Sequence, residues 1–150
     1  MKKIIEIIAT IFYIGYLPAG GTFASFACLP LVLLINKQKV IIQTAFLFLF
    51  TIFSIAISSY AEVIFNKKDD TRIVIDEWVG MLVACLGINL GQTQNLFLLF
   101  IIFRILDISK VLTNKLQKIP SGAGVVLDDF FAGILTNIIF RIIKLLKNLF

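Results

Sequence analysis

The chain has 150 residues, of which 59% are hydrophobic and only 15% are charged, and its mean hydropathy is +1.00. A soluble domain usually carries about 25% charged residues, so this chain has too little polar surface to coat a water-soluble globule. The net charge is +5, but the basic residues lie in short polar gaps between apolar runs. That pattern is typical of membrane topology signals and disfavours nucleic acid as a partner. We expect one membrane domain over residues 1–150.

The first forty residues hold two short apolar stretches. Residues 4–17 are interrupted by Glu6. Because a full span needs about 20 residues, we expect this stretch to lie in the membrane interface or to re-enter. A Gly- and Pro-containing loop runs from Gly15 to Ser25, and residues 26–35 are again apolar but short for a crossing.

Four longer apolar segments follow and are interpreted as membrane helices: 40–61, 73–90, 96–113 and 125–140. The second has 18 residues, about 27 Å at 1.5 Å per residue. A basic, amphipathic tail begins at Arg141. The predicted fold is therefore all-α: a compact polytopic membrane helical bundle of about four spans, with an interfacial or re-entrant N-terminal segment and an amphipathic C-terminal tail.

The basic residues predict an orientation for this bundle. The connections at 62–72 and 110–118 have three basic residues each, whereas the turn at 88–95 has none. The positive-inside rule therefore places the two connections in the cytoplasm and the turn outside. Lys37 and Lys39 would then face outward, which is a mild violation, so the topology of the first forty residues stays open.

Seven of the nine acidic residues fall in three clusters, each at the predicted cytoplasmic end of a helix. The five that should meet at one membrane depth are Asp76, Glu77, Asp107, Asp128 and Asp129. Five carboxylates in an apolar setting would repel one another strongly, and a divalent cation relieves that repulsion. Oxygen-only ligands suit Mg²⁺, which usually keeps several waters and binds alongside a substrate phosphate. The chain has no histidine and no suitable set of cysteines, which disfavours zinc.

The neighbours of these acids also fit a compact site. Arg104 and Lys110 lie three residues before and after Asp107, on one broad helix face. They are either ion-pair partners or groups that hold a substrate phosphate. Gly80 and Gly133 each follow an acid by one helical turn, where a small residue lets helices approach closely.

Each acidic cluster also has a purely structural interpretation. Residues 67–70 would form a solvated loop. The pairs Asp76–Glu77 and Asp128–Asp129 could be helix N-caps, and Asp107 with its two basic neighbours could form a buried salt bridge.

Three further side chains are expected to be structural. Trp78 is interpreted as an anchor at the membrane interface. Cys28 and Cys85 lie in apolar stretches without a partner at metal-ligand spacing, so both are interpreted as packing residues.

Four motifs occur in order: GYLPAGGTFAS (15–25), IVIDEWVGM (73–81), FRILDISK (103–110) and SGAGVVLDDFFAGI (121–134). Together they resemble the phosphatidylglycerophosphatase A family of bacterial membrane phosphatases over about residues 15 to 135. The resemblance implies a magnesium-dependent enzyme of the inner membrane that hydrolyses phosphatidylglycerophosphate to phosphatidylglycerol and phosphate. The family's polar motif positions correspond to Asp76, Glu77, Asp107, Lys110, Asp128 and Asp129, and its loop motif corresponds to Thr22 and Ser25.

The chain departs from the family pattern at four places. Gly20 and Val111 stand where proline is usual, and Ala24 and Ser121 stand where glycine is usual. All the acids and Lys110 are kept, so the departures concern loop geometry more than chemistry.

The missing residues narrow the chemistry to metal-assisted hydrolysis. The absence of histidine excludes histidine-based phosphatases, and neither cysteine has an arginine six residues later. We expect the five acids to supply Mg²⁺ ligands and one general base. Lys110 and Arg104 would neutralise phosphate oxygens, and Thr22 and Ser25 with nearby backbone amides would cradle the headgroup.

Two other classes of function remain open at this point. Acids within a membrane also mark ion or proton pathways, so a small ion or proton-coupled transporter is the alternative. Its acids should lie near mid-membrane on interrupted helices, whereas here they lie at predicted helix ends. A structural membrane subunit is the third class. The sequence makes no prediction of oligomeric state.

Overall fold

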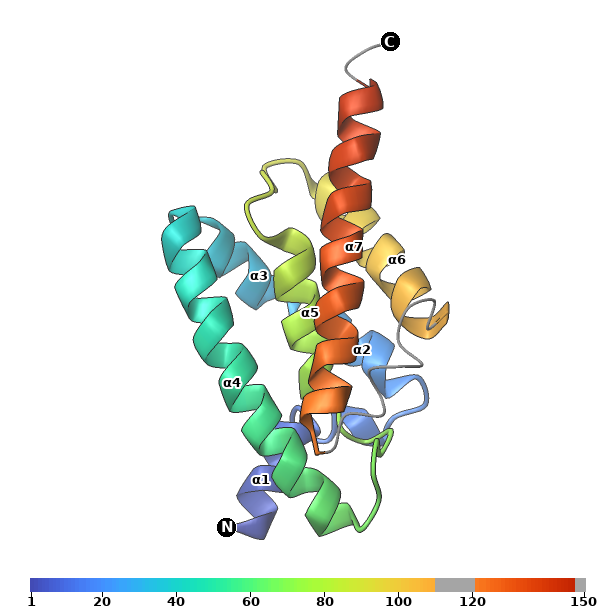
Figure 1. The fold of residues 1–150 in the computed structure, drawn as a ribbon. Coiled ribbons are helices and arrows are strands. Elements are labelled where there is room, and N and C mark those ends of the chain that lie inside the picture. Colours follow the sequence, from blue (N-terminus) through green and yellow to red (C-terminus); the bar gives the residue numbers. More distant parts are fainter. Residues whose placement is uncertain (110–120, 148–150) are drawn as a thin grey trace.

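The computed structural model describes residues 1–109 and 121–147, and within these ranges every regular element is a helix. The elements are α1 (Lys2–Ala9), the 3₁₀ turn η1 (Ile14–Tyr16), α2 (Gly20–Ala27), α3 (Leu29–Asn36), α4 (Val40–Phe65), α5 (Ile75–Cys85), α6 (Thr93–Ser109) and α7 (Ala123–Lys147) (Figure 1). The all-α prediction is therefore confirmed for the described part of the chain.

Two described helices, α4 and α7, are long and apolar enough to cross a membrane. α4 extends beyond the predicted 40–61 and ends where Asn66 adopts a left-handed conformation (φ 50°). α7 has 25 residues and includes the predicted tail, so a separate tail from Arg141 is wrong. The helix continues because no Gly or Pro interrupts the apolar periodicity after Gly133.

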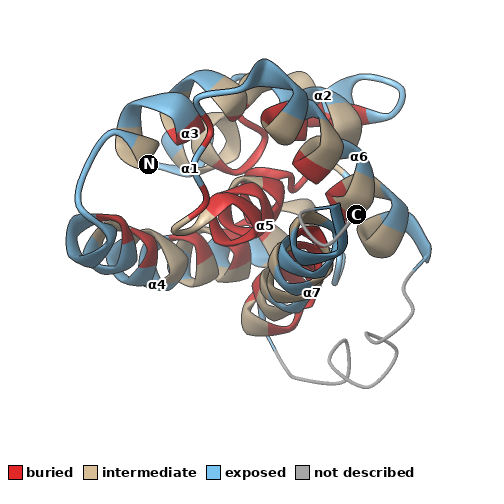
Figure 2. Cartoon of the chain, turned by 90° about the horizontal axis from the view of Figure 1, so that it is seen from above, coloured by how far each residue is buried: buried red, intermediate tan, exposed pale blue. Residues whose placement is uncertain are grey.

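The predicted helix over residues 73–90 is wrong in length, because α5 has only 11 residues. Leu86 leaves the helical region (ψ 121°), and Gly87 turns the chain with φ 65°, which glycine adopts without steric cost. Eleven residues span about 16 Å, too short to cross a bilayer. α5 instead lies at the centre of the bundle, buried along its length, with α2, α3, α4, α6 and α7 packed around it (Figure 2).

The closest helix pair is α5 with α7, and glycine makes this possible. A Cβ atom on Gly133 would overlap the backbone oxygen of Gly80 and the side chain of Val83. A Cβ atom on Gly80 would overlap the ring of Phe103 from α6. The predicted close approach at these two glycines is confirmed.

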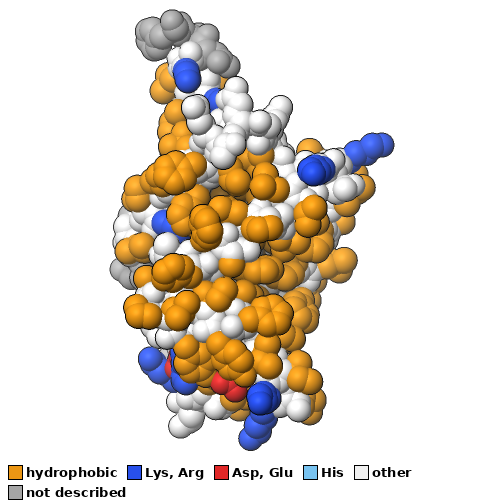
Figure 3. Space-filling view, turned by 180° about the vertical axis from the view of Figure 1, so that it is seen from behind, with side chains coloured by type: hydrophobic (Ala, Val, Ile, Leu, Met, Phe, Trp, Pro, Cys, Tyr) orange, Lys and Arg blue, Asp and Glu red, His pale blue; other side chains and the backbone are white. Residues whose placement is uncertain are grey.

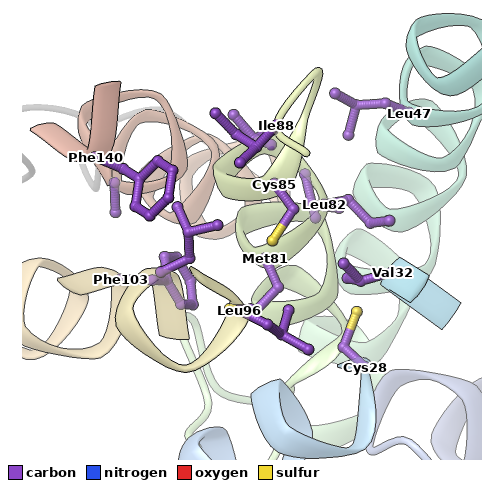
Figure 4. Packing of buried hydrophobic residues seen from close by; sticks show 14 of the residues in the cluster. Cys28, Val32, Leu47, Met81, Leu82, Cys85, Ile88, Leu96, Phe103 and Phe140 are labelled. Carbon is purple, nitrogen blue, oxygen red and sulfur yellow. The ribbon is translucent and has the colours of Figure 1, made fainter. Parts of the chain in front are cut away.

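The main hydrophobic core lies around α5 and is formed by the buried side chains of α5 and of the helices that pack against it. Figure 4 shows Met81, Leu82 and Cys85 of α5 packed among side chains of its neighbours. Cys28 and Cys85 are buried, free thiols within this core, which confirms their prediction as packing residues. Trp78 is half-buried and its Nε1 donates to the carbonyl oxygen of Ala24 (2.9 Å), so its role as an interfacial anchor stays a prediction.

The charges divide the bundle into two ends, with a largely hydrophobic surface between them on the face in Figure 3. The acidic end is where α5 and α7 begin and α4 finishes, and it holds all nine acidic residues of the chain. The basic end is where the chain turns between α3 and α4 and where α7 finishes. Its charged residues are Lys37, Lys39, Arg141, Lys144 and Lys147.

Candidate active site

Three helices bring carboxylates together at the acidic end. Glu77 of α5, Asp107 of α6 and Asp129 of α7 each place one oxygen within 4.8 Å of the other two. Asp76 and Asp128 line the same pocket. The structure thus gathers all five acids that the sequence singled out, from three segments that are distant along the chain.

These acids lie inside their helices and do not cap them. Asp76 and Glu77 are in the first turn of α5, whose N-cap, Val74, makes no side-chain cap bond. α7 begins at Ala123, more than one turn before Asp128. The N-cap interpretation of both acidic pairs is therefore wrong. Only Asp76 and Glu77 lie in a first helical turn, where the positive end of the helix dipole attracts negative charge.

In the described ranges, Arg104 is the cation that lies among the five acids. The Arg104 guanidinium pairs with Glu77 and, at 2.8 Å from Nη1 to Oδ2, with Asp107. Ser25 donates its hydroxyl hydrogen to Glu77 Oε2 at 2.9 Å. The predicted salt bridge between Arg104 and Asp107 is present, yet one guanidinium offsets only part of the charge that five ionised carboxylates carry.

Two carboxylate oxygens in the pocket have no hydrogen-bond partner among the described residues. They are Asp76 Oδ1 and Asp129 Oδ2, and both are buried. Leaving a buried carboxylate oxygen unpaired is costly, so a further positive charge is expected there. Because every candidate ligand atom is a carboxylate oxygen, these five acids fit a hard divalent cation such as Mg²⁺ better than zinc.

The pocket has a volume of about 410 Å³, and two of its walls were not foreseen from the sequence. Gly20 and Gly21 line it at the start of α2, and a Cβ atom on Gly21 would overlap Glu77 Oε1. Asp70 and Thr71 line it from the loop before α5. The adjacent glycines were a visible signal for close backbone approach, whereas nothing in the sequence distinguished Asp70 from its charged neighbours.

The other predicted site residues occupy different positions. Ser25 is buried against Glu77 and is not among the residues that line the pocket. Thr22 is half-buried on α2 and does not line the pocket in the described part of the chain. Lys110 lies outside the described residues.

The loop beside the pocket is held by an ion pair. Asp70 is only 4% exposed, so the expected solvated loop is wrong at this position. Its two oxygens accept hydrogen bonds from Arg72 Nε and Nη2, both at 2.8 Å. These bonds hold the pKa of Asp70 below its usual value of 3.8 and raise the pKa of Arg72. Arg72 also lies over the ring of Phe65, 4.1 Å from its centroid.

An all-helical bundle with two span-length helices and a convergent carboxylate pocket belongs to the class of membrane-associated proteins with a potential metal site. The family model for phosphatidylglycerophosphatase A matches residues 7–144. A protein of Bacteroides thetaiotaomicron named "Putative phosphatidylinositol-3-phosphatase" is 30% identical over 147 residues, covering 92% of both chains. No solved structure matches the chain. The chain belongs to the phosphatidylglycerophosphatase A family, as its four motifs predicted.

Proposed function

We propose that this chain is a magnesium-dependent lipid phosphatase that hydrolyses the terminal phosphomonoester of phosphatidylglycerophosphate. The products would be phosphatidylglycerol and inorganic phosphate. The observation that supports this most strongly is the meeting of Glu77, Asp107 and Asp129, from three helices, within 4.8 Å. Family membership supports a phosphatase acting on phospholipid.

The acids and Arg104 take separate roles in this proposal. Glu77, Asp107 and Asp129, with Asp76 and Asp128, hold the divalent cation, and one of the five accepts a proton from the attacking water. Bound Mg²⁺ supplies charge to stabilise the phosphate oxygens and makes a water easier to deprotonate. Arg104 stays beside the phosphate and offsets its charge. Lys110 remains a predicted phosphate contact.

The residues around the carboxylates position them. Ser25 fixes one oxygen of Glu77 through its hydrogen bond. Gly21 lets the start of α2 approach Glu77, where backbone N–H groups and the helix dipole favour a phosphate. We assign Ser25 a positioning role, and Thr22 stays a prediction without a described contact to the pocket.

The rim of the pocket supports a lipid substrate. Leu17 lines the pocket and is half-exposed, and its neighbours Tyr13 and Tyr16 expose their rings as well. Exposed aromatic and aliphatic side chains beside a charged site are typical of the level where lipid headgroups meet acyl chains. In this proposal the headgroup enters the pocket past Leu17 while the acyl chains stay in the bilayer.

The membrane arrangement is part of the proposal. We propose that the chain is a single multi-pass domain of the bacterial inner membrane with its acidic end in the cytoplasm. The described basic residues outside the pocket are evenly divided between the two ends. The preference for the cytoplasm therefore rests on the basic residues that the sequence places between α6 and α7, namely Lys110, Lys115 and Lys118.

The name of the Bacteroides relative raises a second substrate, a phosphomonoester on an inositol lipid. Both candidates present a terminal phosphate on a polar headgroup that is attached to a diacylglycerol. The carboxylate cluster would act on either in the same way, and the headgroup between the phosphate and the lipid would decide the preference.

The test is phosphate release by the purified, detergent-solubilised chain, from phosphatidylglycerophosphate and from phosphatidylinositol 3-phosphate, with Mg²⁺ or with chelator. We expect release that requires Mg²⁺, is faster with phosphatidylglycerophosphate, and is lost in Asp129→Asn. Lys39→Gln, at the basic end, is the matched control and should keep wild-type release. Folded protein that releases no phosphate from either lipid would overturn the proposal and favour ion-flux assays in liposomes.

A further inference from the structure

A second pocket lies at the basic end, far from the carboxylates. It is formed between the turn that follows α5 and the last turns of α7, and its volume is about 630 Å³. Lys144 on its wall lies fifteen residues beyond Asp129 on α7, about 22 Å at 1.5 Å per residue. The proposed reaction uses no residue of this pocket.

Two cations line this pocket, and one of them is held in place by the fold. Arg141 Nε donates to Asn137 Oδ1 at 2.7 Å, and its Nη2 donates to the carbonyl oxygens of Leu86 and Gly87 at 3.2 and 3.3 Å. These bonds tie the guanidinium to the end of α5. Among the described residues, no acceptor bonds to its Nη1 group, which can still donate to a ligand.

The second cation, Lys144, is half-buried on the same wall. Its ammonium lies 5.8 Å from the ring centroid of Phe140, and no carboxylate lies within ion-pair distance of it in the described ranges. All nine acidic residues of the chain lie at the opposite end. The pocket therefore has positive charge that no side chain of its own end offsets, which favours an anionic ligand.

The remaining walls combine amides with apolar side chains. Gln92 of the turn and Asn95 at the start of α6 border the pocket, and Asn95 Nδ2 donates to the carbonyl oxygen of Asn89 at 3.0 Å. Ile88, Phe140 and Leu145 line it as well, and Leu145 is 64% exposed. A small inorganic anion would contact the two cations and leave the apolar wall exposed. A lipid would contact the cations with its headgroup and the apolar wall with its acyl chains.

We propose that this pocket binds the phosphodiester headgroup of an anionic phospholipid. Arg141 and Lys144 would pair with the phosphodiester oxygens, the side-chain amides on the wall would contact the polar part of the headgroup, and Leu145 would contact the acyl chains. The pocket lies at the end of α7, one of the two span-length helices, which is the level expected for headgroups. The site would anchor the basic end in the membrane.

The test is the apparent Kd of the purified full chain for phosphatidylserine, measured by native mass spectrometry. Phosphatidylcholine with the same acyl chains is the neutral control. Phosphatidylserine is chosen because it is neither substrate nor product of the proposed reaction, so the result does not depend on that function. We expect tighter binding of phosphatidylserine than of phosphatidylcholine, and about fivefold weaker phosphatidylserine binding in Lys144→Gln, the effect of one basic residue near a charged membrane surface.

Two matched variants keep the proposal falsifiable. Lys144→Arg retains the charge and should retain the affinity, and Lys39→Gln removes one charge from the same end outside the pocket and should leave the affinity unchanged. Equal weakening by Lys39→Gln and Lys144→Gln would overturn the proposal in favour of diffuse charge attraction. Displacement of phosphatidylserine by equimolar inorganic phosphate would overturn it in favour of a small-anion site.

Discussion

The pockets at the two ends of the bundle carry opposite charges. At the acidic end, carboxylates from α5, α6 and α7 converge in a pocket, with Arg104 as the described cation that pairs with them. At the basic end, Arg141 and Lys144 line a pocket that no acid borders. The charges within each pocket are not balanced by the described side chains, and we propose that the missing charge differs: a divalent cation with a substrate in one pocket, and an anionic headgroup in the other. Buried carboxylates without enough counter-charge are expensive, and the cations of the second pocket can attract an anion, so we interpret both pockets as binding sites.

The largest expected effect separates the two ends by activity. Asp107→Asn or Asp129→Asn should lower phosphate release by more than about 100-fold, since even the partners that orient metal ligands are worth 10–100-fold. Lys144→Gln should leave release within about twofold, because Lys144 lies fifteen residues beyond Asp129 on α7, about 22 Å away at 1.5 Å per residue. Steady-state phosphate release in detergent measures both. Comparable losses in all three variants would remove the functional distinction between the ends.

The second prediction concerns the close packing of α5 against α7, which connects the two ends of the bundle. Gly133→Ala should destabilise the protein by about 2–3 kcal/mol, because its Cβ would overlap the Gly80 backbone oxygen and overpacked cores cost this much. Because both pockets are built on α7, phosphate release and phosphatidylserine binding should be lost at the same temperature in this variant. Thermal unfolding in detergent gives the stability. Gly91→Ala is the matched control, since Gly91 is exposed and a Cβ there would approach only Asn89 Oδ1, at 3.1 Å. An unchanged Tm in Gly133→Ala would contradict the packing.

The third prediction tests the wall of the acidic pocket. Gly21→Ala should lower phosphate release by about tenfold with little change in Tm, because its methyl group would displace the Glu77 carboxylate, and disturbing the orientation of a metal ligand costs at least this much. A higher Mg²⁺ concentration should recover part of the loss. Kinetics at several Mg²⁺ concentrations check this, with Gly91→Ala again as the control for an added methyl group. Wild-type kinetics in Gly21→Ala would show that α2 does not position Glu77.

The smallest effect concerns the loop beside the acidic pocket. Asp70→Asn should destabilise the protein at neutral pH by about 1 kcal/mol, through the loss of hydrogen bonds to a charged group. Because the pKa of Asp70 is depressed in the folded protein, its contribution is present above the usual value of 3.8 and is lost as the pH falls through the folded pKa. The difference in Tm between wild type and variant should therefore shrink below about pH 4. A difference that does not change with pH would contradict the ion pair.

Much of the site was predictable from the sequence, because helix ends and basic residues indicate depth in a membrane. Asp76, Asp107 and Asp129 could be placed at one end from topology alone, although the length of α5 was wrong. Periodicity does not distinguish a helix that crosses lipid from one that is buried on every side by other helices. α5 is the second kind, and Leu86 and Gly87 end it after 11 residues.

The parts that could not be predicted depend on tertiary contacts. Trp78 could not be placed, because its indole finds a partner in Ala24, more than fifty residues away. Asp70 has the same charge and setting as Asp69 in the sequence, and only packing against the pocket and Arg72 separates the two. Arg141 was interpreted as part of a separate tail, whereas its bonds to Leu86 and Gly87 place it in α7 against the end of α5.

The most direct test of the account is cation binding in the absence of substrate. Isothermal titration of the purified chain with Mg²⁺ should show saturable binding that is lost in Asp129→Asn and kept in Lys144→Gln. In chelator, Asp129→Asn should be at least as stable as wild type, because it removes one of several repelling carboxylates, and Mg²⁺ should raise the Tm of wild type alone. Folded wild-type protein that binds no Mg²⁺, or binding that Asp129→Asn leaves unchanged, would contradict the assignment of the acidic end as a metal site.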